Sequence, residues 1–264
     1  MSHPLFKNRN LIIATKHEKE KVIAPILKKS LGVKCFTNEN FDTDALGTFS
    51  GKVERKLDPI AAARNKCLLA MKASNCDVGV ASEGSFGAHP SIFFASADDE
   101  FLIFIDQKNN LEIIVRELSM ETNFGGAKVK NEKALLNFAA SIKFPSHGLI
   151  LRQSKFENNN LIKGITNLKD LKNTFYFLYK KFNQVYAESD MRAMYNPSRM
   201  NVIKNATIKL IGKINSCCPK CNTPGFGITD VRRELKCSTC SLPTQSTLSY
   251  LYFTDREAIH FSQI

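Results

Sequence analysis

The chain has 264 residues, 43% of them hydrophobic, and a formal net charge of +12. This length and composition predict a globular protein with one substantial core and exclude a disordered chain. No apolar run reaches the roughly 18 residues that a membrane-spanning helix needs, and no apolar signal segment follows the first residues. Eight cysteines, four of them at zinc-ligand spacing, favour a reducing compartment. We therefore expect a cytoplasmic protein that does not bind membranes.

The positive charge is concentrated in the middle of the chain. Residues 1–119 carry 16 Lys or Arg and 15 Asp or Glu, residues 120–214 carry 16 and 6, and residues 215–264 carry 5 and 4. The middle segment therefore holds a net charge of +10. Such an excess is typical of nucleic-acid-binding surfaces, but a lysine-rich composition from an AT-rich genome would also explain it.

The first third of the chain predicts alternating strands and helices. Gly32 ends the first helical period, and Asp58 before Pro59 is typical of an N-cap and first helical residue. The predicted elements are a strand at 11–15, a helix at 22–31, a strand at 33–36 and a helix at 58–73. This order indicates an α/β fold.

The following residues continue this mixture. A buried strand at 77–81 is predicted to break into a polar turn, and two further strands flank a hairpin turn. The remaining predicted elements are strands at 101–106, 111–118 and 148–152, and helices at 132–142, 168–182 and 199–213. We therefore predict one mixed-sheet α/β core domain over residues 1–214, followed by a small module over residues 215–264.

The C-terminal module contains two Cys-x-x-Cys pairs, Cys218 with Cys221 and Cys237 with Cys240, separated by fifteen residues. Each pair can form a knuckle that offers two thiolates, and the intervening loop lets the second knuckle complete a tetrahedral Zn²⁺ shell. We therefore predict a zinc ribbon with one structural zinc. Cys217 would be a spare thiol beside it. Four thiolates leave no open position on the metal, so any reaction is expected upstream.

Polar segments that follow predicted strands or helices are where α/β folds usually collect ligands. The turn after the first strand places Lys16 and Lys19 at a helix start, whose backbone N–H groups can hold phosphate. A solvated helix start is the alternative. A later loop carries Asp42 and Asp44, which offer oxygen ligands for Mg²⁺. A surface loop with Asx-turns is the alternative there.

The predicted turn at Ser82–Gly87 is the strongest candidate. Glu83 is an acid whose burial would be costly without a partner. The glycines permit close approach to the backbone, and Ser85 offers a hydroxyl. A solvated turn glutamate is the alternative. Further along, Arg192 and Arg199 are candidate phosphate clamps, although a helix entry explains them as well.

Short motifs within residues 10–120 resemble the inosine/xanthosine triphosphate pyrophosphatase superfamily. The motifs are Ile12-Ile13-Ala14-Thr15 with Lys19, Arg64-Asn65-Lys66 within a helix, and Asp77-Val78-Gly79-Val80-Ala81-Ser82-Glu83-Gly84. The resemblance implies Mg²⁺-dependent cleavage of nucleoside triphosphates to monophosphate and pyrophosphate. His17 stands where that family has asparagine, and the acid usually paired with the strand-end glutamate is absent. The combination of an α/β domain and a zinc ribbon also resembles an uncharacterised bacterial family of unknown function.

These observations give one main hypothesis and two alternatives. A Mg²⁺-dependent phosphoanhydride hydrolase would act on a nucleoside triphosphate or a related phosphorylated metabolite, with Glu83 and Asp42 or Asp44 holding the metal. The expected phosphate ligands are Thr15, Lys16, Lys19, Arg64, Lys66 and Ser85. Alternatively, the chain is a nucleic-acid- or ribosome-associated zinc-ribbon binding protein, or an inactive relative that binds nucleotide as a signal. The sequence leaves the oligomeric state open.

Overall fold

The computed structural model describes residues 3–38, 58–157, 160–254 and 257–259. They form an α/β fold with parallel and antiparallel strand pairs, which confirms the predicted class. The elements in chain order are β1 (Asn10–Ala14), α1 (Glu20–Leu31), β2 (Lys34–Phe36), α2 (Pro59–Ala73), β3 (Val78–Ala88), β4 (Ser96–Asp106), β5 (Leu111–Ser119), β6 (Gly126–Val129), α3 (Glu132–Ser141), β7 (Leu149–Arg152), β8 (Ile162–Ile165), α4 (Leu168–Phe182), β9 (Val185–Ser189), η2 (Ala193–Tyr195), α5 (Pro197–Asn215), β10 (Gly227–Arg232), β11 (Ser249–Thr254) and β12 (Glu257–Ile259).

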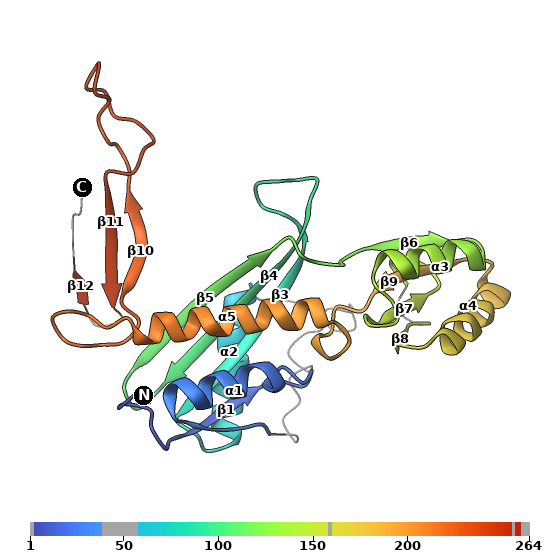
Figure 1. The fold of residues 1–264 in the computed structure, drawn as a ribbon, viewed down its shortest axis with the longest axis horizontal. Coiled ribbons are helices and arrows are strands. Elements are labelled where there is room, and N and C mark those ends of the chain that lie inside the picture. The colour runs from blue at the N-terminus through green and yellow to red at the C-terminus, as the bar shows by residue number, and fades with distance from the viewer. Residues whose placement is uncertain (1–2, 39–57, 158–159, 255–256, 260–264) are drawn as a thin grey trace.

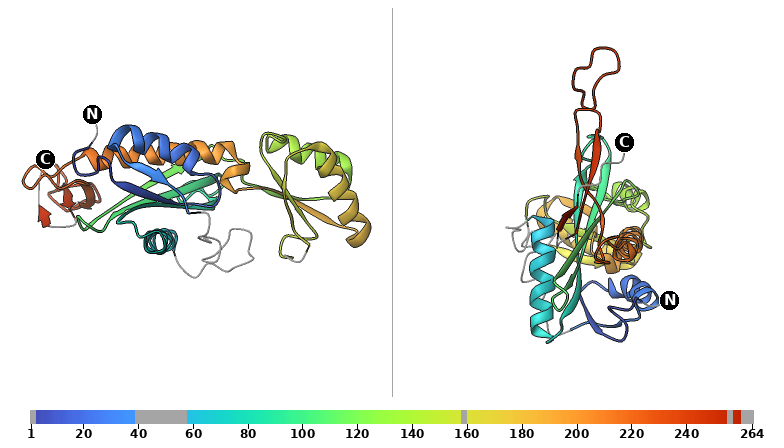
Figure 2. Two further views of the ribbon diagram at one scale, coloured as in Figure 1. Left: turned by 90° about the horizontal axis from the view of Figure 1, so that it is seen from below. Right: turned by 90° about the vertical axis from the view of Figure 1, so that its left-hand side faces the viewer.

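A five-stranded sheet in the order β2-β1-β3-β4-β5 forms the first lobe. β1 pairs in parallel with β2 and β3, whereas β3, β4 and β5 form an antiparallel meander. Helices α1 and α5 cover one face and α2 covers the other (Figures 1 and 2). Successive side chains of a strand point to opposite faces of the sheet, so each strand contributes to both apolar cores. In β1, Ile13 packs with α1 and α5, while its neighbour Ile12 packs with α2.

A second, antiparallel sheet in the order β6-β9-β7-β8 forms the other lobe, together with α3 and α4 (Figure 1). Its apolar core is separate and contains Leu135, Leu171 and Phe175. The chain passes between the lobes at residues 120–125 and 190–196. The sequence suggests one sheet before residue 214, but β6 pairs with the distant β9 instead of extending the first sheet. That long-range pairing produces two lobes.

The ends of the helices lie close to the positions that the sequence predicts. The Asp58 carboxylate accepts hydrogen bonds from the N–H groups of Ile60 and Ala61 at the start of α2. Gly32 follows α1 with a φ of 72°, a conformation that favours glycine. The Asn196 side chain accepts a hydrogen bond from the Arg199 N–H and thereby caps α5.

β3 is longer than the sequence predicts. It pairs with β4 from Val78 to Ala88, so the predicted turn at 82–87 is wrong. Gly84 is required within this strand because a Cβ there would stand 2.2 Å from Glu100 Oε1. β1 ends opposite Ala81, and β3 therefore continues past its parallel neighbour. The residues just beyond that point form the floor of the candidate site.

The cysteine segment follows α5 as a three-stranded sheet in the order β10-β11-β12. β10 and β11 form an antiparallel hairpin that projects from the first lobe (Figures 1 and 2). Their pairing runs from Gly227 with Phe253 to Arg232 with Ser249. In the part of the chain that the structure describes, no helix has both the length and the apolar character needed to cross a membrane.

Candidate functional site

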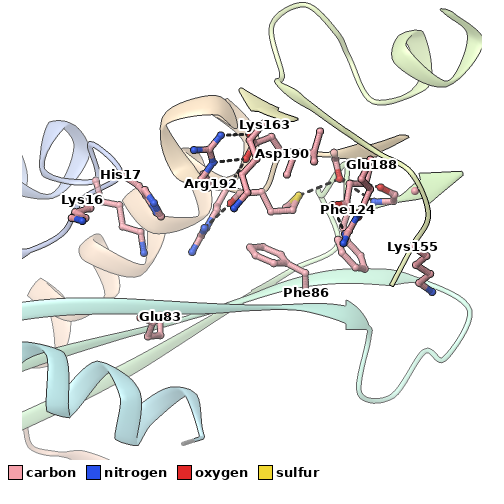
Figure 3. A pocket seen from close by; sticks show the side chains of 18 of the residues that line it. Lys16, His17, Glu83, Phe86, Phe124, Lys155, Lys163, Glu188, Asp190 and Arg192 are labelled. Atoms are coloured by element: carbon pink, nitrogen blue, oxygen red, sulfur yellow. Dashed lines mark hydrogen bonds and ion pairs between the residues drawn. The ribbon is translucent and has the colours of Figure 1, made fainter. Parts of the chain in front are cut away.

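A cavity of about 490 Å³ lies between the two lobes (Figure 3). The turn after β1, α2 and β3 line it from the first lobe, and β7, β9 and the joining segments line it from the second. Its charged lining residues are the cations Lys16, Lys19, Lys66, Arg152, Lys155, Lys163, Arg192 and Arg199 and the carboxylates Glu83, Glu188 and Asp190. Eight cations around three carboxylates favour an anionic ligand.

Glu83 and Lys66 form an ion pair at the floor of the cavity. Lys66 comes from α2, and Glu83 lies on the face of β3 that α2 covers (Figure 3). Their side chains are 10% and 11% exposed, so each charge depends on the other for compensation. The sequence singles out both residues, and the structure brings them together.

Lys19 is a second buried cation, located just before α1. Its Nζ donates hydrogen bonds to Ser82 Oγ at 2.8 Å and to the Ser82 carbonyl at 3.3 Å. Burial and the nearby Arg199 and Lys66 charges lower the pKa of Lys19 to about 7, although Glu100 and Glu83 act in the opposite direction. A polyanion bound nearby would favour the charged ammonium form.

His17 is neutral at neutral pH. Burial, and then the neighbouring Lys19 and Arg199 charges, lower the pKa of its imidazole to about 3. Its backbone N–H donates a hydrogen bond to Thr15 Oγ1 at 3.2 Å, which tightens the turn after β1. A neutral imidazole offers hydrogen-bonding nitrogens without charge. His17 can therefore contribute a neutral hydrogen-bonding group to the lining of the cavity.

Arg199 connects the two lobes. Its side chain is 1% exposed; Nε donates to Glu100 Oε1 at 2.5 Å and Nη1 to the Met191 carbonyl at 2.6 Å. The guanidinium carbon lies 4.9 Å from the ring centroid of Phe86. Burial, and then the Glu100 charge, raise the pKa of nearby Asp98 to about 8. Arg199 is thus fixed between β4 and the segment that enters the second lobe.

The arginines of the second lobe are paired with carboxylates. Arg152 on β7 pairs with Glu188 on β9 at 2.5 Å, and Arg192 pairs with Asp190 at 2.6 Å. Asp190 also accepts a hydrogen bond from the Gly164 N–H at 3.0 Å. These pairs hold the charged groups of this wall in place.

Aromatic rings complete the lining of the cavity. They are Phe86, Phe124, Phe156 and Tyr186. Phe86 on β3 stacks with Phe124 of the joining segment, with ring centroids 6.0 Å apart, and Phe156 is 88% exposed at the rim. Rings in this arrangement can stack with a planar base or with each other.

The family model described as a domain of unknown function, DUF6671, matches residues 66–261. The chain belongs to this family. The matched region begins at Lys66 in the cavity floor and continues through the second lobe and the cysteine hairpin. The matched region therefore includes the cysteine pairs and much of the cavity lining, but not the lining residues before residue 66, which are Ala14, Thr15, Lys16, His17 and Lys19. A search of curated proteins finds no match.

The structure brings part of the predicted site together. The predicted residues that line the cavity are Thr15, Lys16, Lys19, Lys66, Glu83, Arg192 and Arg199. Arg64 instead forms a two-pronged ion pair with Glu112 on β5, at 2.9 Å and 2.5 Å. Two residues along a helix turn by about 200°, so Arg64 and Lys66 cannot face the same cavity. Ser85 lies further along β3 and is not among the described lining residues. Asp42 and Asp44 lie outside the described residues.

The wall from the second lobe was not predicted from the sequence. Tyr186 and Glu188 line the cavity from β9, while Val185, Ala187 and Ser189 alternate with them as buried residues. That alternation over 185–189 is the signal that would have identified the strand and its outward face.

Mg²⁺ binding at the cavity stays a prediction. Within the described ranges, no group of three or more His, Cys, Asp or Glu residues could hold a metal ion. Proteins usually bind Mg²⁺ through one or two carboxylates, substrate phosphates and water. Glu83 supplies a carboxylate at the cavity floor, and phosphate oxygens would supply the rest.

The four predicted zinc ligands do not form one cluster within the described chain. Cys218 and Cys221 lie between α5 and β10, whereas Cys237 and Cys240 lie between β10 and β11 at the far end of the hairpin. The donor atoms of one chain therefore do not fit a single closed tetrathiolate shell. Zinc binding stays a prediction.

Proposed function

We propose that this protein is a cytoplasmic, Mg²⁺-dependent phosphoanhydride hydrolase that acts on a nucleoside triphosphate or a related phosphorylated metabolite. The observation that supports it best is the lining of the cavity between the lobes. Eight cations face three carboxylates there, and four aromatic rings share the same space. A polyphosphate requires the cations, and a nucleobase suits the rings.

The phosphates would bind at the first lobe. The turn that carries Lys16 and Lys19 leads directly into α1, so the positive end of the α1 helix dipole lies beside these two lysines. Lys66 approaches from α2, and Arg199 approaches from α5. The burial of Lys19, Lys66 and Arg199 strengthens their attraction for phosphate, because charges interact more strongly away from water.

Glu83 would act on the attacking water. Its carboxylate would accept a hydrogen bond from that water, while the ion pair with Lys66 holds the carboxylate in position. The water oxygen forms a bond to phosphorus, the bond to the leaving phosphate oxygen breaks, and the released proton passes to the carboxylate. Mg²⁺ bound with the phosphates would supply charge neutralisation for the leaving group.

A nucleic-acid-binding function is the second candidate, and one observation favours it. Arg152, Lys155 and Lys163 all belong to the strongly basic segment 120–214 and all line the cavity. In this alternative they would contact a phosphate backbone, and binding would weaken steeply with salt. An inactive relative would bind a nucleotide in the same cavity without turnover.

The deciding experiment is release of phosphate or pyrophosphate from a panel of ordinary and deaminated nucleoside triphosphates with Mg²⁺. Glu83→Gln keeps the shape but removes the charge, and we expect turnover to fall by about 100-fold or more. Glu112→Gln is the matched control, because Glu112 pairs with Arg64 away from the cavity. Equal release by wild type and Glu83→Gln would rule out this role for Glu83. Binding without any release would favour the inactive relative.

A further inference from the structure

The two cysteine pairs form the same local structure twice. The Asn222 N–H donates to the Cys218 carbonyl at 2.8 Å, and the Ser241 N–H donates to the Cys237 carbonyl at 2.9 Å. Asn222 and Ser241 both adopt a positive φ, 57° and 61°. In each pair the N–H of the first cysteine also donates a hydrogen bond of 2.9 Å to the carbonyl five residues further on, Cys218 to Thr223 and Cys237 to Leu242. An isolated antiparallel β-bridge flanks each pair, Cys217 with Pro224 and Lys236 with Pro243. The chain therefore contains two copies of one knuckle.

Each knuckle provides half of a metal site. A structural Zn²⁺ takes four ligands in a tetrahedral shell, and a Cys-x-x-Cys knuckle supplies two of them. The Thr239 N–H lies 3.5 Å from Cys237 Sγ, a contact that supports a thiolate. Cys221 and Cys240 are exposed, Cys237 is half-buried and Cys218 is buried, so each knuckle presents at least one thiol to the outside of the chain. Each half-site lacks two sulfur ligands.

The hairpin keeps the two half-sites of one chain apart. One knuckle lies at the base of the hairpin, beside the end of α5, and the other lies near its tip (Figure 1). The six residues of β10 separate them, and six strand residues span roughly 20 Å. Bringing the knuckles together within one chain would require breaking the β10–β11 pairing.

The hairpin also exposes apolar side chains. Among its described side chains, those more than one-third exposed are Ile228 (51%), Leu235 (41%), Leu242 (65%), Leu248 (37%) and Tyr250 (42%). A narrow projecting hairpin has little stability of its own in water. A neighbouring hairpin laid against it would cover these side chains.

We propose that Zn²⁺ joins two copies of this chain through antiparallel hairpins. The base knuckle of one copy, Cys218 and Cys221, would share a metal with the tip knuckle of the other copy, Cys237 and Cys240. A two-fold axis then gives two equal sites and one Zn²⁺ per chain. Each site forms four Zn–S bonds and releases the thiol protons to solvent. This proposal is independent of the hydrolase proposal, because no cysteine lines the cavity among the described residues.

The first test measures the mass and zinc content of the full-length chain by light scattering and elemental analysis. We expect a dimer with one Zn²⁺ per chain, and we expect a chelator to convert it to monomers. Cys217→Ser is the matched control and should change neither value, since Cys217 is not a ligand in the proposed site. A zinc-loaded monomer, or a chain that takes up no zinc, would overturn the proposal.

The second test separates closure between chains from closure within one chain. One variant carries Cys218→Ser and Cys221→Ser, and the other carries Cys237→Ser and Cys240→Ser. Each variant alone has only one kind of knuckle and should stay monomeric. An equal mixture should form mixed dimers with one complete site, or about half a Zn²⁺ per chain. A mixture that binds no zinc and stays monomeric would contradict closure between chains. The circular dichroism of the variants would show that the α/β lobes remain folded.

Discussion

The two walls of the cavity are built differently. On the first lobe, Lys19, Lys66 and Arg199 are at most 9% exposed, and each is held by hydrogen bonds or an ion pair. On the second lobe, Lys155 is exposed and the neighbouring Phe156 is 88% exposed. These three cations of the first wall are fixed before any ligand arrives, whereas the rim of the second wall can adjust.

This difference suggests a division of roles within the proposed function. Fixed, buried cations suit the part of a ligand that never varies, which in a nucleotide is the polyphosphate. Aromatic rings at a more open wall suit the base, where discrimination between ligands takes place. Changes to the first wall should therefore affect all polyphosphates alike, and changes to the second wall should affect nucleotides selectively.

The largest effect should follow from Gly84→Ala, which disrupts the first wall. The new Cβ would lie 2.2 Å from Glu100 Oε1 and 2.9 Å from Arg199 Nη2. Breaking a buried ion pair typically costs about 3–5 kcal/mol, so we expect a loss of this order in urea unfolding. Gly87→Ala is the control on the same strand, because a Cβ at Gly87 meets nothing within 4 Å. Equal stability of the two variants would show that Arg199 does not depend on this contact.

A smaller and more selective effect should follow from Tyr186→Ala on the second wall. Stacking of a base on an aromatic ring contributes about 1–3 kcal/mol, so nucleoside triphosphate affinity should fall about 5- to 150-fold. The affinity for inorganic triphosphate, which has no base, should stay unchanged in calorimetric titrations. Tyr176→Ala removes a tyrosine from the exposed face of α4 and serves as the control. If Tyr186→Ala lowered the affinities for nucleoside triphosphate and inorganic triphosphate equally, the second wall would not be selective for the base, and the proposed division of roles would be wrong.

The pH dependence of binding should show the most gradual effect. Lys19 has a pKa of about 7 in the free protein, and a polyphosphate binds its protonated form more tightly. Affinity should therefore be greatest up to about pH 7 and should fall above it, by at most tenfold per pH unit, until the pKa of the complex is reached. Titrations from pH 7 to 9 measure this slope, and Lys19→Met should flatten it. An affinity that rises from pH 7 to 9 would contradict a role for the protonated Lys19 in binding polyphosphate.

Local signals predict much of the fold but only one side of the site. The caps at Asp58 and Gly32 and the apolar periods locate α1, α2 and the hairpin of β4 and β5, because neighbouring residues determine these features. The continuation of β3 through Gly84 could not be predicted, since it depends on Glu100 and Arg199, which are distant in the chain. The second wall was missed for the same reason, because it forms only when β6 and β7 pair with β9.

The central claim is that the fixed cations of the first wall bind polyphosphate, and Lys19→Met tests it most directly. Methionine has nearly the same length without the charge, and removing a buried charge should keep or raise the thermal midpoint. A calorimetric titration with Mg²⁺ and nucleoside triphosphates at pH 6.5 should show one site per wild-type chain. We expect binding to Lys19→Met to be at least about tenfold weaker, in line with about 1.4 kcal/mol for one charged contact. No saturable binding of any nucleotide to the wild type, or equal affinity of the two proteins, would contradict the account.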